Sequence, residues 1–171
     1  MPSTCAKTLL VEVSLASNPG KIKQIYVAID DQSNVSFIDN EHVEFWGVKF
    51  PLQSYRMSSA QRGCGISTKG FQVSGLRLRG LFNKHVLHVP LALSCSGLLD
   101  TRSDTATPAT VCAHAHLTQY AHQSPEFDPS AHTMVLLQCD CREAMPAKLL
   151  SSEEPFLYES PSVWLLWVVF V

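Results

Sequence analysis

Charged residues are scarce in this sequence. They make up 16% of the 171 residues, and the formal net charge is −2, whereas a soluble domain usually has about 25% charged residues. The chain therefore lacks the excess of lysine and arginine that attracts phosphate-bearing partners. We expect neither nucleic acid nor an acidic membrane surface among its partners.

The sequence also lacks an apolar run long enough to cross a bilayer, and its beginning lacks a signal peptide. The longest run, Val163–Val171, has nine residues, whereas a transmembrane helix needs about 20. No apolar stretch of the required length follows Met1–Ala6. These absences predict an intracellular, cytoplasmic protein without a membrane partner. The abrupt apolar end suggests a fragment of a longer polyprotein.

A disulfide framework is not indicated either. Six cysteines would permit one, but they follow no repeating spacing. Together with the expected intracellular location, their scatter favours reduced thiols. The six positions are Cys5, Cys64, Cys95, Cys112, Cys139 and Cys141.

What the sequence does contain is a succession of short extended segments. Leu9–Leu15 and Lys23–Ile29 are rich in β-branched residues, and the turn-forming residues Ser17–Gly20 separate them, which predicts a hairpin. Strands dominate the chain, so the predicted fold class is all-β, in the form of a small closed β-barrel. Further strands are predicted at Val35–Ile38, Gln53–Met57, Phe71–Leu78, Val86–Leu93, Thr133–Leu137 and Val163–Val171.

Two local features interrupt this β pattern. Asp39–Trp46 has the length of one or two helical turns, with Asp39 or Asn40 as the N-cap and Gly47 as the stop. Residues 61–65 (Gln-Arg-Gly-Cys-Gly) are expected to form the mobile tip of a long hairpin, because glycine bends without steric cost.

The second half of the chain is less regular. Residues 94–129 are an excursion rich in Thr, Ser, Ala and His, with one short helix expected near Thr110–Tyr120. We expect a single domain at 8–145, preceded by an extension at 1–7. Residues 146–171 are expected to form a linker and a closing strand.

Asp30 is the residue with the clearest chemical meaning. It directly follows the apolar run Ile25–Ile29, and turn-forming residues come next, so its carboxylate lies at the mouth of a turn. Such a carboxylate accepts hydrogen bonds from backbone N–H groups and hydroxyls. Two carboxylates that share one proton activate a water in aspartic peptidases. An ordinary Asx-turn that closes a hairpin explains the same residues.

Two other kinds of site compete with this interpretation. Zinc accepts the ligand types in the segments 112–116 (Cys-Ala-His-Ala-His) and 139–141 (Cys-Asp-Cys), and His122 and His132 lie between them. However, structural zinc sites usually place two to four residues between paired ligands. A cysteine nucleophile would need a nearby histidine, and no partner for Cys64 is identifiable. We therefore expect no metal and no cofactor.

Five segments occur in an order that is typical of one family. Tyr26–Ile38 is similar to an apolar–apolar–Asp–Ser/Thr–Gly–Ser segment followed by a short Phe-Ile strand, and residues 135–140 are similar to an apolar–Leu–Leu–Gly–Arg–Asp strand. The other three are Gly70–Val73, Asp100–Pro108 before a histidine-rich stretch, and Pro155–Phe156 with Trp167–Val169. In this collinear order the chain resembles the retropepsin-like aspartic peptidase domains of Pao/BEL-type retrotransposon polyproteins.

The resemblance implies an acid-protease barrel with a flap hairpin, and a homodimer that cleaves polypeptide substrates. Each subunit would supply one catalytic carboxylate, that of Asp30, and the pair would activate a water. The active-site turn and the flap tip would bind the substrate, and the flap would exclude solvent. The residues concerned are Asp31, Ser33, Gly63, Cys64 and Gly65.

The sequence departs from the family pattern at three positions. Asp31 occupies the family's Ser/Thr position, while Gln32 and Gln138 occupy two glycine positions. Gln32 lacks the conformational freedom of glycine, and Asp31 adds a negative charge beside Asp30. The alternative is therefore a catalytically inactive relic of the same fold, which acts as a binding or dimerisation module.

Overall fold

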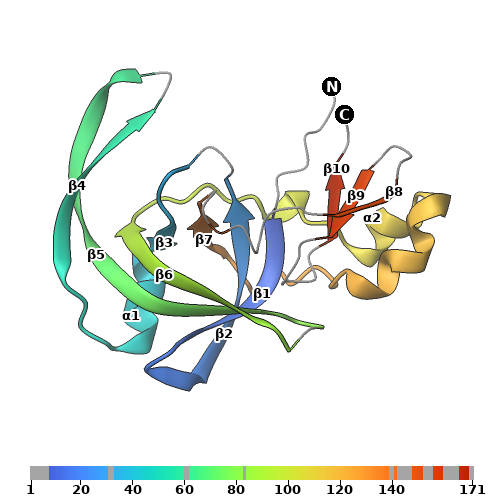
Figure 1. The fold of residues 1–171 in the computed structure, drawn as a ribbon, viewed down its shortest axis with the longest axis horizontal. Helices are drawn as coiled ribbons and strands as arrows, with labels where there is room; N and C mark the ends of the chain where they lie inside the picture. The colour runs from blue at the N-terminus through green and yellow to red at the C-terminus, as the bar shows by residue number, and fades with distance from the viewer. Residues whose placement is uncertain are drawn as a thin grey trace.

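The computed structural model describes residues 8–30, 33–59, 62–82, 84–138, 141, 148–151, 156–159 and 166–169. This part of the chain is mostly β-sheet, with two short α-helices and two 3-10 segments, so the predicted all-β class is confirmed at this level (Figure 1). In chain order the elements are β1 (Thr8–Leu15), β2 (Asn18–Ile29), β3 (Phe37–Asp39), α1 (Asn40–Trp46), β4 (Leu52–Ser59), β5 (Arg62–Gly80), β6 (Val86–Cys95), η1 (Arg102–Asp104), α2 (Pro108–Cys112), η2 (Ala115–Gln123), β7 (Thr133–Leu137), β8 (Lys148–Ser151), β9 (Phe156–Glu159) and β10 (Leu166–Val169).

Seven of the strands belong to one sheet, in the order β1-β2-β7-β3-β6-β5-β4. β1 also pairs with β5, so six strands follow one another in a closed circuit, to which β4 adds as a partner of β5. Strands β8 to β10 form a separate antiparallel sheet. In Figure 1 the β4–β5 hairpin lies at one end of the longest axis of the molecule, and α2 lies toward the other.

The main hydrophobic core is built from alternate residues of the paired strands, because successive side chains of a strand point to opposite faces. Leu9, Val11, Val13 and Leu15 of β1 all belong to it. The intervening Leu10 belongs to a second cluster, which contains Tyr26 of β2 and Ala131. Both faces of β1 are therefore covered at this point, which explains why Leu9, Leu10 and Val11 are consecutive apolar residues.

The helix predicted at Asp39–Trp46 is confirmed as α1. The side chain of Asp39 accepts the N–H of Glu41 at 2.9 Å, and Gly47 ends the helix in the left-handed conformation with φ 66°. Val43 and Trp46 pack into the main core. No helix among the described residues has the length and apolar character needed to span a bilayer.

Two of the predicted element boundaries are wrong. Leu15 pairs with Asn18, so the first turn consists of residues 16–17, and Pro19 and Gly20 already belong to β2. Proline is tolerated there because the beginning of a strand needs fewer ladder hydrogen bonds. The segment predicted as a linker contains β8 and β9, which pair with each other.

Candidate functional site

The end of β2 is held in place by β7. Residues 27–29 pair in parallel with residues 135–137, and the backbone N–H of Asp30 donates a hydrogen bond to the carbonyl of Leu137 at 3.0 Å. Asp30 is thus the first residue beyond the paired part of β2, and its main chain is fixed by the neighbouring strand. Its side chain is partly exposed.

β3 returns along the other side of β7, where Phe37 pairs with Leu136 in antiparallel orientation. β2 and β3, which the loop after Asp30 connects, therefore lie on the two sides of β7. Ser36 closes this loop: it is 1% exposed, its hydroxyl accepts the N–H of Gln138 at 3.1 Å, and its carbonyl accepts the N–H of Leu93 at 3.0 Å. The loop after Asp30 is thereby tied to both β7 and β6.

The structure describes only some of the residues that were predicted to line the active-site turn. Asp31 and Gln32 lie outside the described residues. The hydroxyl of Ser33 donates to the carbonyl of Val35 at 2.7 Å and accepts the N–H of the same residue at 3.4 Å. Ser33 therefore shapes the loop locally, on the Asp30 side of Ser36.

The predicted position of the flap tip is wrong. Met57 pairs with Ile66 and Ser59 with Arg62, so the two strands are still paired at these positions, and residues 60–61 lie outside the described residues. Gly63, Cys64 and Gly65 all belong to β5. A side chain at Gly65 would overlap the side chain of Arg56 on the facing strand, so its glycine serves close packing within the hairpin rather than a bend.

The base of this hairpin is fastened to the body of the sheet at Ser94, which is fully buried in β6. The hydroxyl of Tyr55 donates to the carbonyl of Ser94 at 2.9 Å, and the hydroxyl of Ser94 accepts the N–H of Phe71 at 2.7 Å. The rings of Tyr55 and Phe37 lie 6.0 Å apart. The hairpin and β3, which carries the Asp30 loop, therefore share one anchoring point.

Two titratable groups near this anchor, Tyr55 and Cys95, have raised pKa values. Burial raises the pKa of the Tyr55 phenol, and the neighbouring Cys95 adds to the effect. Burial, together with the negative charge of Asp39, raises the pKa of the Cys95 thiol to about 11. A thiol with so high a pKa is a poor nucleophile at neutral pH, so Cys95 is not a candidate catalytic residue.

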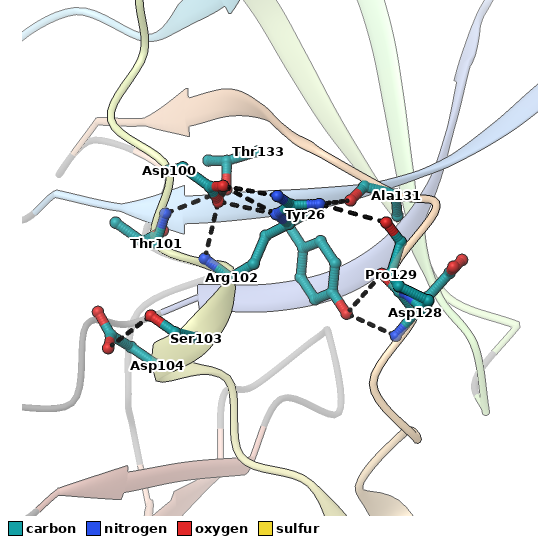
Figure 2. A network of polar contacts seen from close by, with 10 residues as sticks. All are labelled: Tyr26, Asp100, Thr101, Arg102, Ser103, Asp104, Asp128, Pro129, Ala131 and Thr133. Atoms are coloured by element: carbon teal, nitrogen blue, oxygen red, sulfur yellow. Dashed lines mark hydrogen bonds and ion pairs between the residues drawn. The ribbon is translucent and has the colours of Figure 1, made fainter.

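The excursion between β6 and β7 is fastened to the sheet by a polar network (Figure 2). The guanidinium of Arg102 contacts the carboxylate of Asp100, with Nε at 2.9 Å from both oxygens, and donates to the carbonyl of Ala131 at 2.9 Å. The hydroxyl of Tyr26 accepts the N–H of Asp128 at 2.8 Å. Hydrogen bonds from Arg102 lower the pKa of the Asp100 carboxyl. The network thus joins both ends of the excursion to each other and to β2.

The rival zinc site gains no support from the described residues. His114 and His116 have their ring centroids 6.1 Å apart, but no group of three or more potential ligands is found in the described part of the chain. Cys139 and Asp140 lie outside that part, and Cys141 is buried in the main core.

Sequence reasoning did not single out Ser36, Tyr55 or Ser94, which hold the candidate site together. A serine beside a strand is common. The hydrogen-bond partner of Ser36, the N–H of Gln138, is 102 residues away in the chain. The only feature of the sequence that could have pointed to these residues is a polar residue next to an apolar strand. Comparison of the chain with protein-family models, curated proteins and solved structures gives no match.

Proposed function

We propose that this chain is a retropepsin-like aspartic endopeptidase domain of a retroelement-derived polyprotein, with Asp30 as the catalytic carboxylate of each subunit in a homodimer. The observation that carries the proposal is the hydrogen bond from the Asp30 N–H to the Leu137 carbonyl. It joins two of the five segments that carry the resemblance, Tyr26–Ile38 and residues 135–140, although they are far apart in the chain.

Two further features support this proposal. Catalytic carboxylates need a rigid support, because a small displacement of the reacting group lowers the rate strongly. The Asp30 main chain has such a support in β7, and the loop behind it is closed by the buried Ser36. The closed circuit of six strands and the protruding β4–β5 hairpin agree with the barrel and the flap that the family would have.

The chemistry would require two chains. Two Asp30 carboxylates about 3 Å apart across a two-fold axis cannot both ionise, so the pair would hold one proton. The ionised carboxylate takes a proton from a bound water, whose oxygen attacks the peptide carbonyl. The protonated carboxyl donates its proton to the carbonyl oxygen, and the amine then leaves with a proton as the C–N bond breaks. The hairpin would cover the substrate during these steps.

Cleavage of a peptide library at about pH 5 tests the proposal. The wild type should cleave, and Asp30→Asn should lose at least about 100-fold in rate, since general acid–base catalysis contributes roughly 10²–10⁴-fold. Asp104→Asn is the matched control, because this acidic residue lies in the excursion and should leave the rate unchanged. Equal activity in wild type and Asp30→Asn would refute the role of Asp30.

An inactive relic of the same fold is the second candidate, and the replacement at position 32 favours it. The replacement at position 138 does not, since no described residue other than glycine has a positive φ. Gln138 keeps an ordinary backbone and donates its N–H to Ser36. The relic hypothesis therefore depends on Asp31 and Gln32.

This second candidate makes its own prediction. If the wild type is inactive because of position 32, Gln32→Gly should create cleavage activity, whereas Gln138→Gly should not. Each variant needs a circular dichroism spectrum that matches the wild type. Absence of activity in a folded Gln32→Gly dimer would count against this second candidate.

A further inference from the structure

A second site of chemical interest lies on the outer face of β1 and β5. A cavity of about 60 Å³ is found there, and Ser14, Arg77, Arg79 and Glu12 provide its polar walls. Ser14 pairs with Arg77, and Glu12 pairs with Arg79. Paired residues of antiparallel strands share one face, so these four side chains stand together on the face turned away from the main core.

The charges in this cavity are not balanced. Arg79 forms an ion pair with Glu12, with its Nε 2.8 Å from the carboxylate. The Nε of Arg77 is buried and has no hydrogen-bond partner. Within the described part of the chain, no other group pairs with the Arg77 guanidinium either. The cavity thus holds one surplus positive charge.

Leaving a desolvated guanidinium N–H without an acceptor is costly, and an anion that supplies the acceptor removes this cost. The planar fork of arginine matches the two oxygens of a carboxylate or a phosphate group. The cavity volume of about 60 Å³ is several times the roughly 10–15 Å³ that one water needs. The cavity therefore has room for a carboxylate or phosphate group. The Ser14 hydroxyl on the neighbouring strand offers a further donor.

We propose that the cavity between β1 and β5 binds a single oxyanion group, a carboxylate or a phosphate, on Arg77. The site lies at the end of β1 opposite to Asp30, because Ser14 is next to the first turn whereas Thr8 pairs with Ala28 beside Asp30. It is therefore separate from the proposed peptidase site, and it stands whether or not the chain cleaves peptides.

Inorganic phosphate and acetate are titrated in parallel into the full chain at constant ionic strength, with chloride as the third arm. Amide chemical shifts of Ser14 and Arg77 and the Nε–H signal of Arg77 report binding. Saturable shifts with phosphate or acetate, but not with chloride, are expected, and the arm that saturates at the lower concentration identifies the preferred group. No saturable shift with either anion overturns the proposal.

Three variants connect the binding to the geometry. Arg77→Gln should weaken binding at least about ten-fold, as expected for the loss of a charge-assisted hydrogen bond. Arg56→Gln, on the β4–β5 hairpin, should leave it unchanged. Glu12→Gln should strengthen it, because the carboxylate that repels the anion is gone. If Arg77→Gln does not fold, the Glu12→Gln result decides, and unchanged or weaker binding in that variant overturns the proposal.

Discussion

At the scale of single residues, His42 is the most unusual titratable group. It is fully buried on α1, and neither ring nitrogen has a hydrogen-bond partner in the described part of the chain. Its ring stacks on Phe45 and meets the edge of Trp46 at a centroid distance of 4.5 Å. Burial, with a smaller contribution from Lys23, lowers the pKa of His42 to about 3.

This depressed pKa predicts a loss of stability in mild acid. Below its ordinary pKa of 6.5 the unfolded chain takes up a proton at His42, which the folded chain refuses until about pH 3. The free energy of unfolding should therefore fall as the pH drops through this window. At about pH 5 the loss from this residue is about 2 kcal/mol, from 1.36 kcal/mol per pH unit.

Urea unfolding of wild type and His42→Leu at several pH values measures this effect. The variant should show a flatter pH profile below pH 6.5, since leucine has no proton to gain. Parallel profiles for the two proteins would show that His42 is not responsible. The comparison also bears on the proposed cleavage assay at about pH 5, where the fraction of folded protein must be known.

At the scale of elements, the hairpin depends on a close approach at Gly70. A side chain there would overlap the Ser94 carbonyl oxygen and the ring of Tyr55. Gly70→Ala should therefore lower the free energy of unfolding by about 1–3 kcal/mol, as overpacking does, and weaken the anchor of the hairpin. Gly20→Ala is the matched control, because nothing lies within 4 Å of its added carbon, and its effect should stay within about 0.5 kcal/mol. Equal stability of the two variants by urea unfolding would contradict this packing argument.

The excursion makes a second prediction at this scale. Arg102 joins Asp100 to the carbonyls near β7, so Arg102→Gln should loosen the segment between β6 and β7. Limited proteolysis should cut residues 100–132 several-fold faster in the variant, because local opening exposes the backbone. Arg56→Gln serves as the control for the loss of one positive charge. Identical digestion patterns would mean that the apolar contacts of Tyr26 and Ala131 hold the excursion without the ion pair.

The elements also show which parts of the fold can be predicted from the sequence alone. α1 was predictable because its start and stop signals, Asp39 and Gly47, act on neighbouring residues. The flap tip was misplaced because the glycines suggested a bend, whereas the register depends on the partner strand. The position of β7 between β2 and β3, and the role of Ser36, result from pairing across about a hundred residues. No local pattern encodes such a pairing.

At the scale of the whole molecule, the proposed peptidase needs two copies of the chain. Specific activity should rise with protein concentration while monomers are being converted to dimers, and should become constant when dimers predominate. Sedimentation velocity over the same concentrations measures the dimer fraction. If activity per chain did not change while the dimer fraction rose, each subunit would be acting alone, and a shared carboxylate pair would be ruled out.

The position of β7 between β2 and β3 also affects the order in which the chain can fold. During synthesis, β2 and β3 leave the ribosome long before β7, so the pairs on both sides of β7 cannot form until the whole excursion has been translated. Until then Asp30 has no carbonyl from Leu137 to hold it. A nascent polypeptide that stops short of residue 133 therefore contains Asp30 without the strand that holds it, so the site proposed for catalysis forms only after β7 has been translated.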